Sequence, residues 1–599
     1  MTIIARNIAI LATLGASFAM LATAQDIHTE VDVDYNETPQ LREINKLNFP
    51  ATLNLPAEKT TRMPYSTANV RIGVPRTITT LEPVAYGDTI YTTPYRGYAA
   101  LGFMPTFNAA ISAGYKVLDT DKTRLNAWMQ YDGNVYKGER MLIYDGEPED
   151  KVYARRHTVL LGTSLHQAIG NTSFIDAGVD YTYSHYNTPI FPETCHQGVH
   201  RLNASMLWTL KYGGLNYGLG AEYGRFAYVN QIGYDIAPDI NGSLLPKNPM
   251  RENHFQVNGF FNGKFWGASS VGINVALSHN SYERTFKLVQ NPSFPNSILP
   301  IAQEQNQLTT LTLNPFYQVD IDKIKLDLGA QIDLTFNAGK MFHIAPKVKA
   351  LWDVSDFVKL YAKISGGSWA NRLGSLYDVT PYAMPYQSFR NSQIPFEGEV
   401  GVTVGMLKGF YAELSASYAI ANDWVMPQMT AIGSDDSHLS DMSMMITDFA
   451  VMDYSGYRLH GALGYNWRDI VDVKASIDIA PQKLDKGYYL WRDRAKTVAS
   501  AQVRVTPIAQ LDVELGWEYR GSRSVYSTVY DAGGLTTNYH GTLRSLGNTN
   551  NLTAGALYRI DSQWSAFLRG ENLLNHHSLM IGGMPSQGIT GLIGVTYKF

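Results

Sequence analysis

The chain of 599 residues lacks several features that a soluble or disulfide-bonded protein of this length would carry. Cys195 is its only cysteine, which excludes an internal disulfide. Charged residues make up 17% of the sequence, against roughly one quarter in ordinary soluble proteins. The formal net charge of −4 gives no reason to expect a nucleic acid or another polyanion as a partner. No helical periodicity of any length follows residue 25, so we expect no long helix after that point.

The N-terminus carries the three parts of an export signal. Arg6 provides the positive charge, residues 8–21 form the apolar stretch, and residues 22–24 (Ala-Thr-Ala) form a cleavage site of the A-x-A type. A transmembrane helix is the alternative, which the short length and small side chains of the stretch disfavour. We therefore expect residues 1–24 to be a signal peptide and the chain to be exported.

Aromatic residues are abundant, at 12% of the sequence, and they occur in long segments that alternate between apolar and polar side chains. In residues 588–599, Ile593 and Val595 fall on one face and Lys598 on the other. Residues 324–336 repeat the pattern. Such strands are about twice as long as the five to six residues typical of globular proteins, and their length suits an oblique crossing of a bilayer.

The connections between these segments alternate between tight turns and long polar stretches. Short turns on the periplasmic side and long loops outside are typical of a barrel in the outer membrane of a Gram-negative bacterium. The pattern predicts an all-β fold, a large antiparallel transmembrane β-barrel over residues 97–599 with about 22 strands, in a range of about 18 to 22. Four tryptophans lie within about four residues of a tight turn, as an aromatic girdle requires, namely Trp266, Trp352, Trp467 and Trp564.

The last 35 or so residues of the chain carry a motif of their own. Residues 565–575 read SAFLRGENLLN, and the final strand ends on a phenylalanine. This resembles the C-terminal end of TonB-dependent receptors, with the motif at Glu571, Asn572, Leu573, Leu574, Asn575 and Phe599. Ile589 departs from the pattern, because the family often has arginine there. The resemblance implies an outer-membrane barrel that takes part in nutrient or solute transport.

The N-terminal part departs further from that family. Its members carry a globular plug of well over a hundred residues, whereas only residues 25–96 are available here, and that stretch holds seven prolines. We expect it to be a periplasmic segment that acts as a reduced plug or an arm. The lumen of so wide a barrel must then be filled by inward side chains, folded-in loops, the N-terminal segment or another protein.

The candidate site residues follow from these two interpretations. The resemblance implies a contact with TonB by strand addition near the cleavage site, at Thr29, Glu30, Val31, Asp32 and Val33. Alternation implies a polar lumen lined by Lys325, Asp327, Asp333, Asp512, Glu514, Glu518 and Arg520. Aromatic residues of the long loops would capture solute: Trp369, Tyr377, Tyr382, Tyr386 and Trp491.

The sequence suggests no catalytic residues, no cofactor and no metal site. Cys195, His196 and His200 lack a fourth ligand, and no nucleophile motif or phosphate-binding loop is present. We therefore expect a protein that is not an enzyme. Its expected partners are outer-membrane lipid, the barrel-assembly machinery during biogenesis, and TonB or another outer-membrane subunit.

Two other functions compete with receptor-like transport. A barrel that has lost its plug could serve as a structural subunit of a larger outer-membrane complex, and an unplugged barrel could act as a passive porin. The residues name no solute, because loop aromatics suit sugars and many other ligands equally well.

Overall fold

The computed structural model describes residues 95–104, 108–139, 151–187, 196–229, 250–265, 269–283, 286–291, 294–302, 307–337, 339–382, 391–407, 409–433, 444–468, 470–480, 482–484, 495–521, 523–531, 539–580 and 584–599. The predicted signal peptide and the candidate TonB contact at residues 29–33 lie outside these residues, as does nearly all of the predicted N-terminal segment. Within the described residues, no helix is long and apolar enough to cross a membrane.

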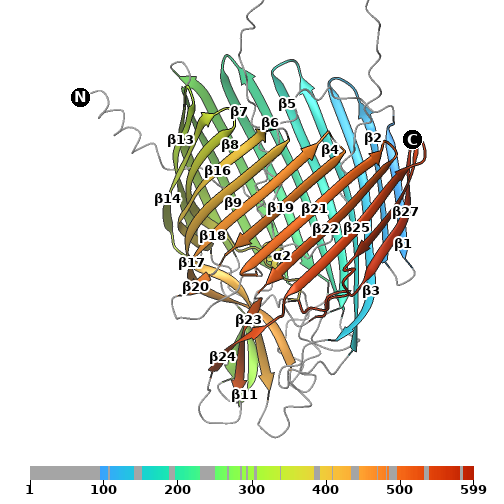
Figure 1. Ribbon diagram of the computed structural model, residues 1–599. Coiled ribbons are helices and arrows are strands. Elements are labelled where there is room, and N and C mark those ends of the chain that lie inside the picture. Colours follow the sequence, from blue (N-terminus) through green and yellow to red (C-terminus); the bar gives the residue numbers. More distant parts are fainter. Residues whose placement is uncertain are drawn as a thin grey trace, which may run out of the picture.

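Twenty-two strands of the described chain form one closed antiparallel barrel (Figure 1). In order around the barrel they are β1 (Gly97–Met104), β2 (Asn108–Asp119), β3 (Thr123–Glu139), β4 (Lys151–Ile169), β5 (Ser173–Asn187), β6 (His196–Tyr212), β7 (Leu215–Tyr228), β8 (Arg251–Phe265), β9 (Ser269–Glu283), β12 (Gln307–Ile321), β13 (Ile324–Phe336), β14 (Phe342–Ser355), β15 (Val358–Ala370), β16 (Asn391–Leu407), β17 (Phe410–Gly433), β18 (Met444–Trp467), β19 (Val471–Ile479), β21 (Thr497–Ile508), β22 (Leu511–Gly521), β25 (Thr549–Arg559), β26 (Trp564–Glu571) and β27 (Thr590–Lys598). Each strand pairs with the next, and β27 pairs with β1 to close the ring. The predicted fold class and strand number are confirmed.

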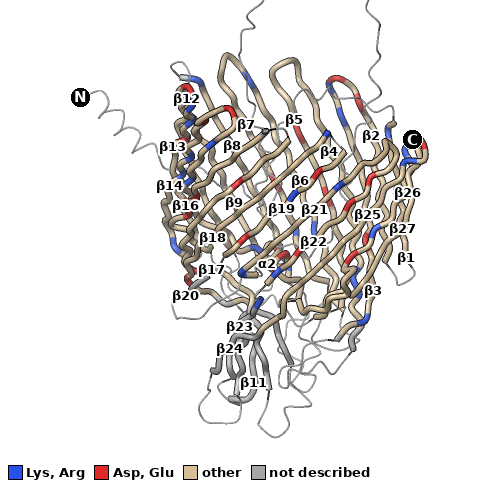
Figure 2. The backbone as a smooth tube through the Cα atoms, viewed as in Figure 1, with Lys and Arg blue, Asp and Glu red and all other residues tan. Residues whose placement is uncertain are grey.

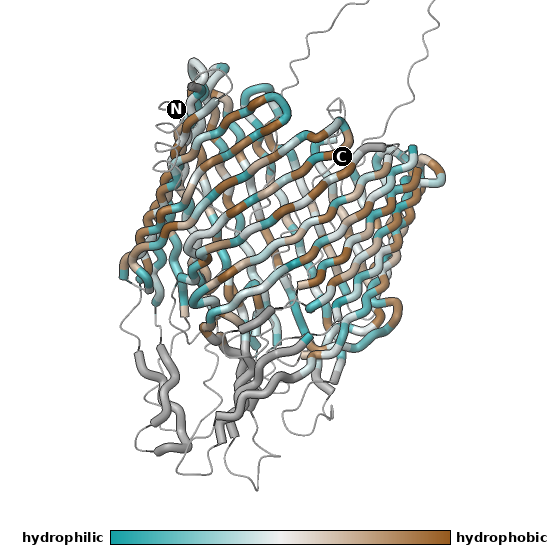
Figure 3. Tube along the Cα trace, turned by 60° about the vertical axis from the view of Figure 1, so that its left-hand side comes forward, coloured by the Kyte–Doolittle hydropathy of each residue, from teal (hydrophilic) through white to brown (hydrophobic). Residues whose placement is uncertain are grey.

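Alternation of side chains explains why these residues form a membrane barrel. Along β22, Val513, Leu515 and Trp517 are exposed. On the other face Asp512, Glu514 and Glu518 make ion pairs and hydrogen bonds. Figure 3 shows the same change between apolar and polar residues along strand after strand, and Figure 2 shows charges spaced along them. The exposed apolar face is therefore the one that meets lipid.

Bonds between strands that are not neighbours identify the inner face. The amide of Ser368 on β15 donates a hydrogen bond of 2.8 Å to the carboxylate of Asp333 on β13, although β14 separates the two strands. A side chain can reach past the neighbouring strand in this way only on the inner side of the barrel, so Asp333 points into the lumen. On β13 the residues with odd numbers thus face the lumen and those with even numbers face lipid.

The two ends of the barrel differ. Tight turns join β2 to β3, β4 to β5, β6 to β7 and β12 to β13 at the end that lies uppermost in Figure 1, together with the C-terminus. Trp352, Trp467 and Trp564 lie near turns of this end and are exposed. Trp266, the fourth predicted girdle residue, lies outside the described residues.

The opposite end carries further strands where the alternation of turns and polar stretches predicts long loops. There β17 continues to Gly433, and β18 begins at Met444. Further strands project there: β10 (Phe286–Asn291) pairs with β11 (Phe294–Ala302), β20 (Gln482–Leu484) with β18, and β23 (Ser524–Asp531) with both β17 and β24 (Tyr539–Ser545). Polar composition hid these strands, because outside the bilayer neither face has to be apolar.

The C-terminal residue completes the closure of the barrel. Its carbonyl accepts hydrogen bonds from the amides of Arg96 and Gly97, and its own amide donates to the carbonyl of Gly97 at 3.0 Å. The ring of Phe599 covers Gly97, where a Cβ atom would come within 2.6 Å of it, so only glycine leaves this space. The predicted terminal strand with a boundary aromatic is thus part of the seam.

Candidate functional site at the outer mouth of the lumen

A segment between β15 and β16, residues 371–382, turns into the barrel, and we call it the strap. It contains the one helix of the described chain, α2 (Leu373–Val379). With seven residues this helix is too short to be stable alone, so tertiary contacts must hold it. The strap is anchored at its base on β12–β14 and at its tip on β5–β8.

Two glycines bend the β15–β16 hairpin inward at the base of the strap. The pairing of β15 with β16 shifts register between Ser365 and Gly367. A Cβ atom on Gly366 would lie 2.4 Å from the carbonyl oxygen of Ile394, and Gly367 has a φ of +146°. Neither position accepts a larger residue without strain, so the inward bend depends on this pair.

Asp333 fixes the bent hairpin to the wall. Its side chain is 0% exposed and accepts hydrogen bonds from the amide of Ser368 at 2.8 Å, from Thr312 Oγ1 at 2.7 Å and from Gln331 Nε2 at 2.8 Å. A buried carboxylate with three donors is well satisfied, and removing it would leave those donors without an acceptor. Asp333 therefore stabilises the base of the strap.

Polar contacts hold the tip of the strap on the far wall. Arg201 on β6 donates to both carboxylate oxygens of Asp378, at 2.8 and 3.3 Å, and to the carbonyl of Gly374 at 3.3 Å. The amide of Leu373 donates to Glu252 Oε2 at 2.5 Å, and the hydroxyl of Tyr186 donates to the carbonyl of Pro381 at 2.6 Å.

Apolar side chains fill the space between the strap and the wall, and we call this set the mouth cluster. Its buried members from the strap are Leu373, Leu376, Tyr377 and Tyr382. They pack with residues of the wall and of two other connections: Ala154, Tyr186, Val199, Phe226, Tyr228, Met250, Tyr282, Leu308, Phe449 and Met584. Because Phe449 and Met584 come from β18 and from the β26–β27 connection, the cluster joins distant parts of the ring. Folded-in loops thus occupy the outer mouth of the lumen.

Two tyrosines predicted to capture solute belong to this cluster instead. Burial raises the pKa of Tyr377, and it raises the pKa of Tyr382 to about 12, so both stay neutral at ordinary pH. Their rings pack against Tyr186 at centroid distances of 6.0 and 5.9 Å. In this state they do not face the exterior. Tyr386 and Trp491 lie outside the described residues, and Trp369 is part of β15.

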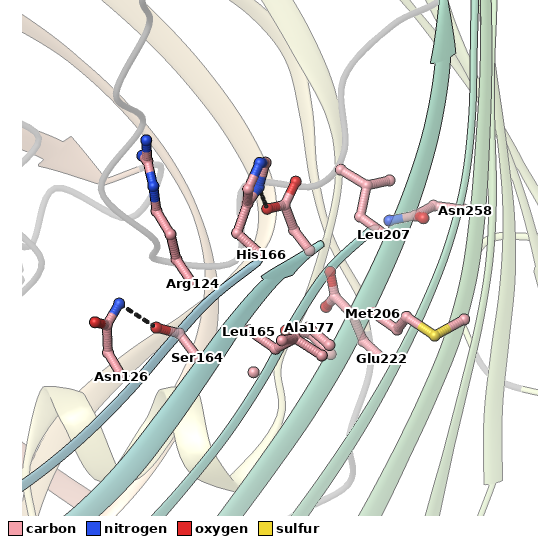
Figure 4. Close-up of a pocket in the computed structure, with 13 residues that line it drawn as sticks. Arg124, Asn126, Ser164, Leu165, His166, Ala177, Met206, Leu207, Glu222 and Asn258 are labelled. Carbon is pink, nitrogen blue, oxygen red and sulfur yellow. Dashed lines mark hydrogen bonds and ion pairs between the residues drawn. The ribbon is translucent and has the colours of Figure 1, made fainter. Parts of the chain in front are cut away.

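A cavity of about 510 Å³ lies on the inner wall below the tip of the strap (Figure 4), and we call it the trough. Two adjacent cross-strand rows of inward residues form its floor: Arg124, His166, Asp176, Leu207 and Asn258, and beside them Asn126, Ser164, Gly178, Ser205 and Glu222. His166 Nδ1 and Asp176 Oδ1 lie 2.6 Å apart. Arg201 and Ser205 are four positions apart on β6, so the trough begins about 13 Å beneath the anchor of the strap.

The other predicted lumen residues are distributed along the wall. Lys325 pairs with Asp320 at 3.6 Å, and Lys349 stands opposite Asp327. Across β21, β22 and β25 a ladder of pairs is formed by Asp512 with Arg559, Glu514 with Arg504, and Glu518 with Arg520. These groups neutralise one another locally. That they line a path for solute stays a prediction.

The C-terminal motif has a structural role that can be read from its bonds. Asn572 and Asn575 have φ values of +49° and +48°, which asparagine tolerates better than most residues. Asn572 Nδ2 donates to the carbonyls of His576 and Gln587, both at 2.9 Å, and Asn575 Oδ1 accepts from the amide of Ile589 at 2.9 Å. The motif therefore folds the last connection back to the start of β27.

Among the described residues, no group of three or more His, Cys, Asp or Glu side chains could hold a metal ion. Cys195, one of the weak candidate ligands, lies outside them.

Sequence reasoning missed the residues that matter most at the mouth, Arg201, Glu252 and the two glycines of the bend. Gly366-Gly367 in an otherwise alternating strand was the one available signal, since glycine inside a strand marks a bulge or a close approach.

Comparison with known proteins gives matches in structure alone. No family model and no curated protein matches the chain. The ferric enterobactin receptor PfeA of Pseudomonas aeruginosa superposes with a TM-score of 0.60 at 11% identity, over 84% of this chain and 80% of that one. The siderophore receptor PirA of Acinetobacter baumannii gives 0.59 at 10% identity, over 85% and 81%, and the FrpB iron transporter of Neisseria meningitidis gives 0.60 at 11%, over 85% and 82%.

These similarities confirm the resemblance at the level of the fold. The chain has the same barrel fold as these solved receptors, and the share of it that superposes is close to the share taken up by residues 97–599. At such low sequence identity the comparison supports the fold of this chain and does not indicate which ligand it binds.

Proposed function

We propose that this chain is an outer-membrane receptor that takes part in the uptake of a nutrient or another solute. The observation that carries the proposal is the outer mouth, where the chain's own strap closes a barrel of the receptor type through contacts that can separate without breaking the wall. A lumen closed by a segment with two anchors suits regulated passage better than free diffusion. It disfavours a passive porin, which needs an open path.

Energy for opening would come from the periplasm, through the candidate TonB contact at residues 29–33. A short segment of this kind adds as a strand to its partner, with main-chain hydrogen bonds providing the affinity. Proline cannot donate such a bond, so Val31→Pro should block the contact. We assign no enzymatic role, in keeping with the solved receptors and transporters that share the fold.

Uptake in cells tests this proposal. A strain that lacks the chain is compared with its parent for growth on single nutrients, and each nutrient that separates the two is tested again with TonB deleted and with Val31→Pro. Loss of growth in all three strains supports energised uptake. Growth equal to the parent on every nutrient contradicts a role in uptake, while growth lost without the chain but kept without TonB contradicts the energised route alone.

A second function is favoured by one observation, the close packing of the buried side chains of the mouth cluster. A lumen sealed in this way also suits a structural subunit of an outer-membrane complex, in which the barrel serves as a scaffold. Purification of the full chain in mild detergent separates the two. A partner recovered in equal amount, together with unchanged nutrient uptake on deletion of the chain, would identify the scaffold.

A further inference from the structure

The trough has the chemistry of a binding site rather than of a structural wall. Arg124 lies at its β3 end and Glu222 lies on β7, and neither makes a hydrogen bond or an ion pair with another described residue. Between them, His166 Nδ1 and Asp176 Oδ1 form a hydrogen bond with each other. Elsewhere on the wall, the ladder of β21, β22 and β25 pairs its charges. A cation and an anion held apart at the two sides of one cavity call for a ligand with the opposite charges.

The floor of the trough is shaped to accept an extended chain. Ser164, Gly178 and Ser205 give it small side chains in the middle of one row, with Asn126 and Glu222 at the ends of that row. Its volume of about 510 Å³ is within the range of small-molecule sites. Asn258 Oδ1 is buried against Gly220 and has no hydrogen-bond partner in the described chain.

From this arrangement we propose that the trough binds a short peptide with free termini, its carboxylate on Arg124 and its ammonium group on Glu222. The inference rests on the proposed function and names the class of solute. Arg124 on β3 and Glu222 on β7 are four strand spacings apart, about 19 Å along the wall. Allowing for the reach of both side chains, an extended peptide of about four residues, about 14 Å long, joins them.

Two features favour a peptide over a sugar. Among the described residues, no Phe, Tyr or Trp side chain lines the trough, whereas sugars bind on the faces of such rings. The guanidinium group of Arg124 also offers the forked donors that match a terminal carboxylate.

Calorimetry on the full chain in detergent tests the proposal with tetra-alanine as the probe. Tetra-alanine should bind, and Arg124→Gln and Glu222→Gln should each weaken binding about tenfold or more, as expected when a charge-assisted contact is lost. The amidated peptide should bind equally well to the parent and to Arg124→Gln, and the acetylated peptide equally well to the parent and to Glu222→Gln. Arg504→Gln, on the ladder, is the matched control and should leave the affinity unchanged.

A second variant tests the shape of the site. A Cβ atom on Gly178 would meet its nearest neighbours at 3.6 and 3.7 Å, which is ordinary contact, so Gly178→Leu should fold and fill the trough. Gly555 on β25 has similar space, at 3.7 Å, and Gly555→Leu is its control. Gly178→Leu should abolish binding of tetra-alanine and Gly555→Leu should not. Retained gel mobility of the unboiled barrel verifies that both variants fold.

The results that overturn the peptide proposal differ from those that overturn transport. Three results would each overturn the peptide proposal: no binding of tetra-alanine, equal affinity for tetra-alanine in the parent and in both charge variants, or binding of maltotetraose in place of the peptide. None of these results changes the outcome of the nutrient-uptake test. Peptide binding with all the expected losses, in a chain whose deletion changes no uptake, would instead support the site and contradict the proposed function.

Discussion

Replacing Arg201 with alanine should loosen the strap while the barrel stays folded. The guanidinium group connects β6 to the strap through Asp378 and through the carbonyl of Gly374, and it lies 5.6 Å from the ring centroids of both Phe226 and Tyr377. No ladder bond of the wall depends on this side chain. The variant therefore removes one anchor and leaves the mouth cluster in place.

The size of the effect follows from the exposure of the pair. A shielded hydrogen bond to a charged group contributes about 1.5–3 kcal/mol, and an exposed ion pair about 0.2–1 kcal/mol. Since the side chain of Asp378 is 41% exposed and that of Arg201 is 28% exposed, the pair falls between these limits. With the carbonyl bond and the contacts to the two rings, we expect a total of about 2 kcal/mol. The equilibrium for local opening of the strap should then rise about 30-fold.

Amide hydrogen exchange measures this opening directly. The amides of Leu376 and Thr380 bond within α2 to the carbonyls of Arg372 and Leu376, at 2.9 and 3.1 Å, so they exchange when the strap opens. Their exchange should be about 30 times faster in Arg201→Ala, with the wall unchanged. Arg504→Ala, which removes a lumen arginine that does not touch the strap, should change neither. Unchanged exchange of the strap in Arg201→Ala would refute the anchoring role.

Three further predictions concern the base of the strap, its pH dependence and the C-terminal motif. Asp333→Ala should leave the amide of Ser368 without an acceptor and cost about 1–3 kcal/mol, seen as faster exchange of residues 366–370; exchange equal to the parent would contradict this. Burial raises the pKa of Tyr382 to about 12, so its hydroxyl binds the proton more tightly in the closed strap than in an open strap that exposes it to water. The strap should therefore weaken as the pH rises from about 10 to about 12, and a strap protease-resistant across that range would be inconsistent with it. Asn572→Ala should lose two donated bonds and an asparagine-favoured turn, and lower the thermal transition of the unboiled barrel on gels. Asn550→Ala, which removes only the acceptor of a hydrogen bond from Trp517 Nε1, should have a smaller effect.

The barrel could be predicted from the sequence because a membrane forces a simple rule on every strand. Each crossing needs about ten residues with one apolar face, and this period of two is visible without knowledge of the partners. Ile593 and Val595 in the last strand, and the alternation of residues 324–336, are examples in which the predicted outward face is the exposed one. The tight turns were visible for the same reason, through their glycine, asparagine and aspartate content.

The closure of the mouth could not be predicted, since it depends on contacts between residues far apart in the sequence. Arg201 and Asp378 are 177 positions apart, and nothing near either of them signals the pair. The seven residues of α2 are too few to show a helical period. The trough is a further case, because its rows exist only once six strands are set in register. Side chains such as Arg124 and Glu222 then meet one cavity although no motif joins them.

The C-terminal motif stands between these cases. The residue types of the motif point to a resemblance, but their structural role, a local turn geometry, cannot be read from the sequence. Asn572 and Asn575 adopt positive φ and close the last connection, a role that any barrel with this seam could need. The motif therefore supports the fold more strongly than it supports a transported solute.

Planar-bilayer conductance tests the central claim, that the chain's own strap closes the outer mouth of a receptor-type barrel. The full chain is compared with a variant in which residues 372–381 are replaced by a Gly-Ser linker of equal length. The account predicts no steady current through the full chain and a large steady current through the variant. A large steady current through the full chain, or silence of the variant in a barrel that is shown to be folded, would contradict it.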